Sequence, residues 1–278
     1  HKDKLHVWQP PDVPYGHVLT SPGREAARAL TRIDGPARDA LLAALRAEKG
    51  KWTLNNIAWA LAELDEPRAV TPLAEHIAAR RGGDAAIRAL GRLGDPNAVD
   101  ALIRRMAHGW SARPSSDALV AIGPPAVPAL VEVLQAGLPK QADQRHMPAL
   151  AAETLGYIGG PEATNMLAGA VREGATADIR FAAVRGLFRA VPADRHAELY
   201  VAALDDDDWR VRAKAAEALA ACGRAGDVRV LAERLADDAD LTVRGQAARA
   251  LGATGQAAAA DALHEALNDP SIFVREQA

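Results

Sequence analysis

The sequence of 278 residues predicts an all-α solenoid of about eight stacked helix–turn–helix repeats with a partial ninth. Three observations support this fold class. Ala and Leu, both strong helix formers, dominate the composition, whereas aromatic residues make up only 4%. An alanine-rich phrase that ends in Ala-Leu recurs with a period near 31 residues. Gly, Asp or Pro follows most copies of this phrase, where a helix should end.

An anchor leucine in each phrase sets the period. The anchors are Leu30, Leu61, Leu90, Leu119, Leu155, Leu187, Leu219 and Leu251, with spacings of 31, 29, 29, 36, 32, 32 and 32. Such a period is typical of architectures in which each repeat is one supersecondary unit. A unit of this size buries too little surface to fold alone. Neighbouring repeats must therefore complete each core, and stability should pass from repeat to repeat.

The third repeat illustrates how each unit divides into two helices. Residues 84–93 place apolar side chains on one helical face, and the Gly-Asp-Pro turn at residues 94–96 ends that helix. A second helix then places Val99, Leu102 and Met106 along one stripe, at the spacing of an amphipathic helix. The other units carry comparable turns, so the same division is expected throughout.

The two ends and one loop depart from the repeat. Residues 21–278 form the predicted solenoid, and residues 1–20 form a leader rich in Pro, His and aromatic residues. The leader is expected either to cap the first repeat or to join a further domain. Residues 269–278 open a ninth first helix, so either the protein continues or this half-repeat is the cap. An enlarged loop at residues 137–145 accounts for the spacing of 36, and inserted loops often carry recognition.

Two late repeats resemble a known family. Residues 208–219 and 240–252 share Asp, then Val-Arg, then Ala-Ala-x-Ala-Leu. This pattern resembles the short bacterial HEAT repeats named after phycobilisome lyases, and the resemblance covers nearly all of the chain after residue 22. It implies a right-handed superhelix whose concave face is lined by the second helix of each pair. It implies no single activity, because such repeats serve as scaffolds, lyase subunits and accessory domains.

Composition excludes several classes of function. The net charge is −3, with 33 basic and 36 acidic residues and no basic stripe, so nucleic acid is an unlikely partner. No run of 18 apolar residues occurs, which argues against a membrane-spanning segment. The single cysteine, Cys222, excludes an internal disulfide and a Cys-rich zinc site. Because the chain starts at His1, the sequence leaves open both what precedes it and the compartment.

No catalytic motif is evident. The chain has no nucleophile elbow, phosphate-binding glycine loop or metalloprotease motif. No two histidines have the spacing of a helical metal site, and His264-Glu265 is the only His-Glu dipeptide. Deoxyhypusine hydroxylases share this repeat architecture but need several such pairs to hold two irons. We therefore predict no catalytic residue, no metal and no cofactor, and we disfavour an enzyme.

Charged residues near the helix starts have two interpretations. Arg180, Arg212, Arg244 and Arg275 each follow a Val or Ile early in a first helix. They either grip an anionic partner or pair with a turn Asp of the same or the next repeat, and we favour the second interpretation. The run at residues 205–208 either binds a cation or caps the following helix, where carboxylates complement the helix dipole. We favour capping.

The outward positions of the second helices predict a partner-binding surface. Carboxylates outnumber basic groups there, and the candidate residues are Glu75, Asp100, Arg104, Glu132, Glu233, Asp261 and Glu265. If they line the concave face, the groove should attract a basic or mixed-charge protein segment. The alternative is a merely solvated face. Trp52 and Trp110 lie in equivalent inter-repeat connections, where they either form binding hot spots or fold back over the solenoid edge. Trp59 is expected in the core.

The leading functional hypothesis is a protein–protein interaction scaffold that holds a protein segment on the concave second-helix face. A chromophore lyase-like subunit is an alternative from the family resemblance, and it requires an apolar or aromatic pocket. A HEAT-like DNA glycosylase would need a basic groove around Trp110 and Asp100. The acidic balance argues against that function, because phosphate contacts dominate DNA affinity. A spacer domain of a larger protein is the remaining alternative.

Overall fold

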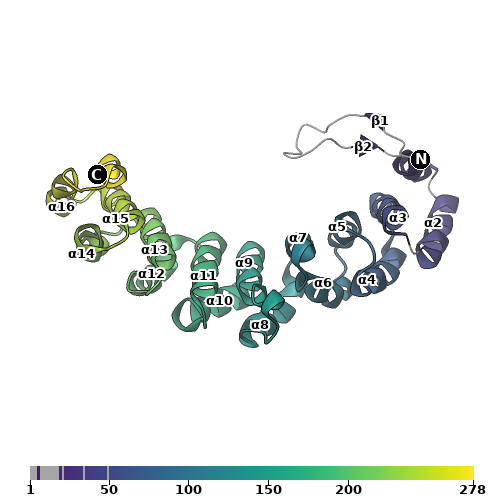
Figure 1. The fold of residues 1–278 in the computed structure, drawn as a ribbon, viewed down its shortest axis with the longest axis horizontal. Helices are drawn as coiled ribbons and strands as arrows, with labels where there is room; N and C mark the ends of the chain where they lie inside the picture. Colours follow the sequence, from purple (N-terminus) through teal and green to yellow (C-terminus); the bar gives the residue numbers. More distant parts are fainter. Residues whose placement is uncertain (1–4, 7–18, 21, 34, 49) are drawn as a thin grey trace. The chain divides into compact units, whose positions relative to one another are not determined.

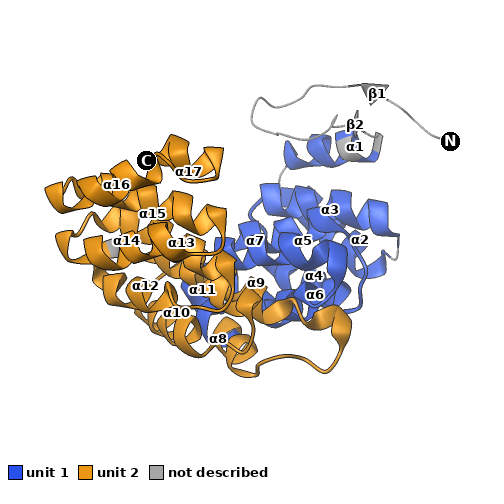
Figure 2. Ribbon diagram, turned by 60° about the vertical axis from the view of Figure 1, so that its left-hand side comes forward, with its two compact units in different colours: residues 1–129 blue, residues 130–278 orange. Residues whose placement is uncertain are grey.

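The computed structural model describes residues 5–6, 19–20, 22–33, 35–48 and 50–278 (Figure 1). The chain divides into two compact units, residues 1–129 and 130–278, which are shown in different colours in Figure 2. Two short segments of the leader pair as antiparallel strands, β1 (Leu5–His6) and β2 (Leu19–Thr20). The rest of the leader, including Trp8, lies outside the described residues, so its predicted capping role stays a prediction.

Helices form nearly all of the described chain. Unit 1 contains α1 (Pro22–Thr31), α2 (Gly35–Ala47), α3 (Lys51–Glu63), η1 (Pro67–Ala69), α4 (Val70–Ala78), α5 (Asp84–Leu93), η2 (Pro96–Ala98), α6 (Val99–Met106), η3 (Gly109–Ser111), α7 (Ala112–Ile122) and η4 (Pro124–Ala126). Helix α8 (Val127–Gln135) runs across the division between the units. Unit 2 contains η5 (Ala142–Gln144), α9 (Met147–Ile158), α10 (Pro161–Glu173), α11 (Ala177–Ala190), η6 (Ala193–His196), α12 (Ala197–Ala203), α13 (Trp209–Cys222), η7 (Ala225–Asp227), α14 (Val228–Asp237), α15 (Leu241–Thr254), η8 (Ala257–Ala259), α16 (Ala260–Ala266) and α17 (Ile272–Gln277).

These helices confirm the predicted all-α solenoid of two-helix repeats. Odd-numbered helices are the first helices of the repeats and even-numbered helices are the second, with α17 opening the ninth repeat. In the third repeat, Gly94 adopts the left-handed conformation with φ of 67° and ends α5. The side chain of Asp95 accepts a hydrogen bond of 2.8 Å from the backbone N–H of Asn97, which caps the turn before α6. The turn chemistry in the sequence therefore sets the repeat boundary.

The anchor leucines form the core of each repeat. Seven of them are fully buried, namely Leu61, Leu90, Leu119, Leu155, Leu187, Leu219 and Leu251. Leu30, in the first repeat, is only half-buried. Burying a leucine side chain contributes roughly 1.5–3 kcal/mol. Because every repeat contributes one such residue to a shared interior, the predicted period corresponds directly to the core.

The first helices pack more closely against one another than the second helices do. In unit 2, α9, α11, α13 and α15 form one row and α10, α12, α14 and α16 form the other (Figure 1). Glycines allow the close approach, since a Cβ added at Gly156 of α9 would lie 2.2 Å from the Cα of Gly186 in α11. The more closely spaced row lies on the inside of the bend within each unit. The expectation that the second helices line the concave face is therefore wrong for each unit.

Candidate functional site

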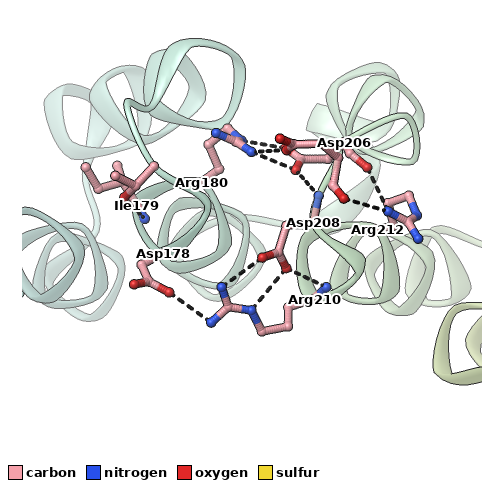
Figure 3. Close-up of polar contacts among 9 residues, drawn as sticks. Asp178, Ile179, Arg180, Asp206, Asp208, Arg210 and Arg212 are labelled. Atoms are coloured by element: carbon pink, nitrogen blue, oxygen red, sulfur yellow. Dashed lines mark hydrogen bonds and ion pairs between the residues drawn. The ribbon is translucent and has the colours of Figure 1, made fainter. Parts of the chain in front are cut away.

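Three arginines that follow a Val or Ile early in the first helices of unit 2 bind aspartates of the following repeat, as Figure 3 shows for Arg180 and Asp206. Arg180 of α11 donates to Asp206 through Nε at 2.6 Å and Nη2 at 2.9 Å. Arg212 of α13 donates to Asp238 at 2.8 and 2.9 Å. Arg244 of α15 repeats the arrangement with Asp269, at 2.8 and 3.1 Å. We call these three pairs the arginine–aspartate ladder.

A third hydrogen bond joins successive pairs of the ladder. Nη1 of Arg212 donates to the backbone carbonyl of Asp206 at 2.9 Å, and Nη1 of Arg244 donates to that of Asp238 at 2.8 Å. Each of these aspartates thus accepts one arginine on its carboxylate and the next arginine on its carbonyl. The prediction that the arginines pair with turn aspartates is confirmed for Arg180, Arg212 and Arg244, whereas Arg275 donates to the backbone carbonyls of Asp269 and Pro270. Because their donors are engaged inside the fold, these arginines are not a grip for an anionic partner.

Burial and pairing act in opposite directions on the carboxylates of the ladder. Burial raises the pKa of Asp238. Hydrogen bonds from Arg212 and from the backbone N–H of Asp240 lower it and together outweigh the effect of burial, so the net shift of the pKa is downward. The pKa of Asp269 is lowered chiefly by its hydrogen bonds from Arg244. Both carboxylates are therefore held in the charged form that the ladder requires.

The acidic run at residues 205–208 is also neutralised within the fold. Each of its four carboxylates pairs with an arginine: Asp205 with Arg234, Asp206 and Asp207 with Arg180, and Asp208 with Arg210. Asp208 also caps α13, because its side chain accepts a 2.8 Å hydrogen bond from the backbone N–H of Arg210. The capping interpretation is confirmed. In the described part of the chain, no group of three or more His, Cys, Asp or Glu residues is arranged to hold a metal ion.

A groove between α14 and α16 brings together three of the predicted partner-binding residues. We call it the acidic groove, and its volume is about 640 Å³. Its charged lining residues are all carboxylates: Glu233, Asp237, Asp261, Glu265 and Asp269. Alanines at positions 232, 236, 262 and 266 line the surface between them. The groove therefore combines a small-residue apolar surface with a concentrated negative charge.

Three carboxylates of the acidic groove have no partner among the described residues. Asp269 belongs to the ladder, and Glu233 pairs with Arg229 one turn earlier on α14, at 2.5 Å. The carboxylates of Asp237, Asp261 and Glu265 make no hydrogen bond or ion pair with any residue that the structure describes. Their charges are therefore available to a ligand.

The charge of the acidic groove reflects that of its unit. Residues 130–278 carry 16 basic and 22 acidic residues, a net charge of −6, whereas residues 1–129 carry 17 and 14, a net charge of +3. The corresponding groove between α10 and α12, with a volume of about 460 Å³, is not uniformly acidic, because Arg172 and Arg180 are among its lining residues. The acidic groove is therefore a local property of the last two repeats.

Sequence reasoning found only part of this groove. It predicted Glu233, Asp261 and Glu265, which lie at the outward positions of α14 and α16. It missed Asp237 and Asp269, which lie where α14 ends and in the turn before α17. Asp237 is the last residue of α14 but does not lie at one of the predicted outward positions, and Asp269 lies outside any helix. The Asp that follows a second helix would have been the signal to include.

The remaining predicted charged residues are exposed but lie outside the acidic groove. They are Glu75 on α4, Asp100 and Arg104 on α6, and Glu132 on α8. Their exposure agrees with an outward position, and a role in binding remains a prediction.

The tryptophans occupy different environments from those expected. Trp52 lies in the first turn of α3 rather than in a loop and is 80% exposed, and Trp110 lies in η3 and is 100% exposed. Neither folds back over the solenoid, so their proposed role as binding hot spots stays open as a prediction. Trp59 was expected in the core, but it is only half-buried and lines a groove between α3 and α5.

None of the helices within the described ranges is long and apolar enough to cross a membrane.

Comparisons with known proteins agree with the repeat assignment. The family of HEAT repeats matches residues 197–278, and the family of the PBS lyase HEAT-like repeat matches residues 84–108. None of the curated proteins matches the chain. Both family matches fall on two-helix units of the solenoid described above.

The chain is also similar to several solved structures. The structure of Kap121p is 13% identical with a TM-score of 0.55, and the match covers 91% of this chain but only 35% of that protein. The complex of CpcE and CpcF of phycocyanin lyase from Nostoc sp. PCC7120 is 26% identical with a TM-score of 0.47, covering 58% of this chain and 99% of that one. Human deoxyhypusine hydroxylase is 21% identical with a TM-score of 0.29, covering 91% and 86%. The likeness to Kap121p shows the solenoid fold, and with the two family matches the chain is a HEAT-repeat protein of the phycobilisome-lyase-like type.

Proposed function

We propose that this HEAT-repeat protein is an interaction scaffold that binds a basic segment of a partner protein in the acidic groove. The observation that carries the proposal is the composition of that groove. All of its charged lining residues are carboxylates, and Asp237, Asp261 and Glu265 have no partner among the described residues. Three uncompensated negative charges in one groove favour a cationic ligand.

The shape of the acidic groove suits lysine and arginine side chains. Their aliphatic stems can lie along the alanines of α14 and α16 while their charged ends reach the carboxylates. Opposite potentials increase the rate of encounter and determine the register of the bound segment. Each exposed charge pair contributes roughly 0.2–1 kcal/mol, so three of them give a modest, salt-sensitive affinity.

The position of the groove changes the sequence-based hypothesis. The groove lies between second helices, as predicted, but their row is on the outside of the bend within unit 2 (Figure 1). The proposed binding surface is therefore the outer groove of the last two repeats rather than a concave second-helix face. Glu233, Asp261 and Glu265 are the residues of the hypothesis that the proposal keeps, and the face that carries them is revised.

A labelled synthetic peptide of alternating Lys and Leu tests the proposal by fluorescence anisotropy. The triple variant Asp237→Asn, Asp261→Asn, Glu265→Gln removes the unpaired charges, and we expect it to weaken binding by about tenfold or more. Binding to the unaltered protein should also weaken as salt is added. A matched control, Asp117→Asn, Asp143→Asn, Glu162→Gln, removes three exposed carboxylates outside the groove.

We expect the control to bind the peptide within about twofold of the unaltered protein. Equal weakening by both triple variants would show non-specific attraction to the acidic chain and would contradict the groove. Unchanged binding by the groove variant would contradict it as well.

A further inference from the structure

A second groove, on the first-helix row of unit 1, has the opposite character. It lies between α3 and α5, has a volume of about 270 Å³, and is lined by Trp59 and Asn56 on one side and by Arg88 on the other. We call it the tryptophan groove. Its lining residues lie between positions 55 and 92 in unit 1, whereas those of the acidic groove lie between positions 232 and 270 in unit 2, so the two grooves share no residue.

Small residues opposite the indole ring keep this groove open. Ala85 and Ala89 of α5 line the wall across from Trp59, and an alanine leaves space that a larger side chain would fill. The side-chain oxygen of Asn55 accepts hydrogen bonds from the backbone N–H groups of Gly83 at 2.9 Å and Ala86 at 3.3 Å. These bonds tie α3 to the start of α5 and hold the two walls in position.

Two polar side chains of the tryptophan groove are unused within the fold. At one end, Arg92 forms an ion pair with Glu63, so these two charges compensate each other. The guanidinium of Arg88 and the amide of Asn56 make no hydrogen bond or ion pair with any described residue. The groove therefore carries one uncompensated positive charge, one free amide and the face of a half-buried indole ring.

We propose that the tryptophan groove binds an acidic segment of a partner protein. Arg88 would take a Glu or Asp carboxylate through two parallel N–H donors, the geometry for which a guanidinium is suited. The amide of Asn56 can both donate to and accept from a peptide backbone. Trp59 supplies an apolar wall for the side chain next to that carboxylate in the bound segment. Tryptophan and arginine are both enriched in binding hot spots.

The charge of the groove decides between an acidic segment and other occupants. A basic segment would place its cations against Arg88, which no carboxylate in the groove compensates. A nucleic acid would require several phosphate contacts, and the groove offers a single uncompensated guanidinium. A short acidic peptide matches both the single uncompensated charge of Arg88 and the small volume of the tryptophan groove.

A labelled peptide of alternating Glu and Leu tests this assignment by fluorescence anisotropy. We expect Arg88→Gln to weaken its binding by about tenfold or more, because a charge-assisted hydrogen bond is lost. Arg46→Gln, which removes an exposed arginine of α2 outside the groove, should leave binding within about twofold. Thermal melting by circular dichroism checks that both variants stay folded.

The location of the bound peptide is checked separately by NMR of the ¹⁵N-labelled protein. The indole N–H signal that disappears in Trp59→Phe should be the one that shifts on titration with the Glu-Leu peptide. Three outcomes would each overturn the assignment. They are equal weakening of Glu-Leu binding by Arg88→Gln and Arg46→Gln, a Trp59 signal that does not move on titration with the Glu-Leu peptide, and displacement of the Glu-Leu peptide by a short oligothymidine at a concentration below that of the peptide. Loss of Lys-Leu binding in the acidic-groove variant has no bearing on it, so the two proposals fail independently.

Discussion

Arg212 and Asp238 connect two successive repeats through two parallel hydrogen bonds, with the Asp238 side chain only 2% exposed. The two residues are 26 positions apart, and Arg180 and Asp206 have the same separation. The ladder therefore follows the repeat, and each arginine sits in one first helix while its aspartate precedes the next. Because the same contact recurs between successive repeats, the ladder holds each repeat of unit 2 against the next one.

Removing one partner of a buried pair should destabilise unit 2 strongly. Asp238→Asn leaves the guanidinium of Arg212 without its counter-charge, and breaking such a pair typically costs about 3–5 kcal/mol. We expect a lower midpoint of urea denaturation followed by circular dichroism. The matched control is Arg229→Gln, which breaks the exposed pair with Glu233 on α14 and should cost about 0.5 kcal/mol or less. Similar losses for the two variants would show that the ladder does not stabilise stacking.

The ladder also predicts acid sensitivity. The pKa values of Asp238 and Asp269 are lowered in the folded protein from an ordinary value of 3.8. Their contribution to stability is thus fully present above pH 3.8 and is lost as the pH falls through the folded pKa values. In unit 1, hydrogen bonds from Arg68 lower the pKa of Glu66 to about 2, so its contribution is lost as the pH falls through about 2.

Melting temperature measured against pH checks this sign. The unaltered protein should lose stability as the pH drops below about 4. Asp238→Asn should show a shallower loss over the same range, because one of the titrating groups is absent. A variant curve parallel to that of the unaltered protein would contradict the prediction.

The glycine contact between α9 and α11 should tolerate no side chain. Gly156→Ala would place a Cβ 2.2 Å from the Cα of Gly186, so the helices must move apart. Overpacking of this kind typically costs about 1–3 kcal/mol. Gly169→Ala in α10 is the control, since nothing lies within 4 Å of the added Cβ there. We expect that substitution to stabilise the helix by roughly 0.5–1 kcal/mol in urea denaturation, because alanine is the better helix former.

Arg80 occupies a backbone position that favours glycine. Its φ is 58°, at the end of α4, where the N–H of Arg81 donates to the carbonyl of His76 at 2.8 Å. The left-handed conformation costs a non-glycine residue about 1 kcal/mol. Arg80→Gly should therefore raise the free energy of unfolding by about that amount, as measured in urea. Arg81→Gly, at a position without positive φ, should not stabilise the protein, and a gain from both would refute this explanation.

Much of the fold was predictable because its signals are local. The spacing of Leu90 and Leu119 follows from helix periodicity and from turn residues such as Gly94, which act within a few positions along the chain. Pairing of Arg212 with a turn aspartate was predictable as a kind of contact, but its partner Asp238 lies two residues before the aspartate of the repeated motif, Asp240. The acidic groove was only partly predictable, because Asp237 lies at the end of α14 away from the predicted outward positions and Asp269 lies in the turn before α17.

The sequence by itself determined the number of repeats, the turn that divides the third repeat into two helices, and the seven of eight anchor leucines that are fully buried, and it favoured pairing of the arginines with turn aspartates. Only the tertiary structure decided that Trp59 faces a groove rather than the core, and that the first helices lie on the inside of the bend within each unit. These features depend on how closely neighbouring helices approach. That distance is set by many small contacts at once, such as the one between Gly156 and Gly186, and no single stretch of sequence encodes it.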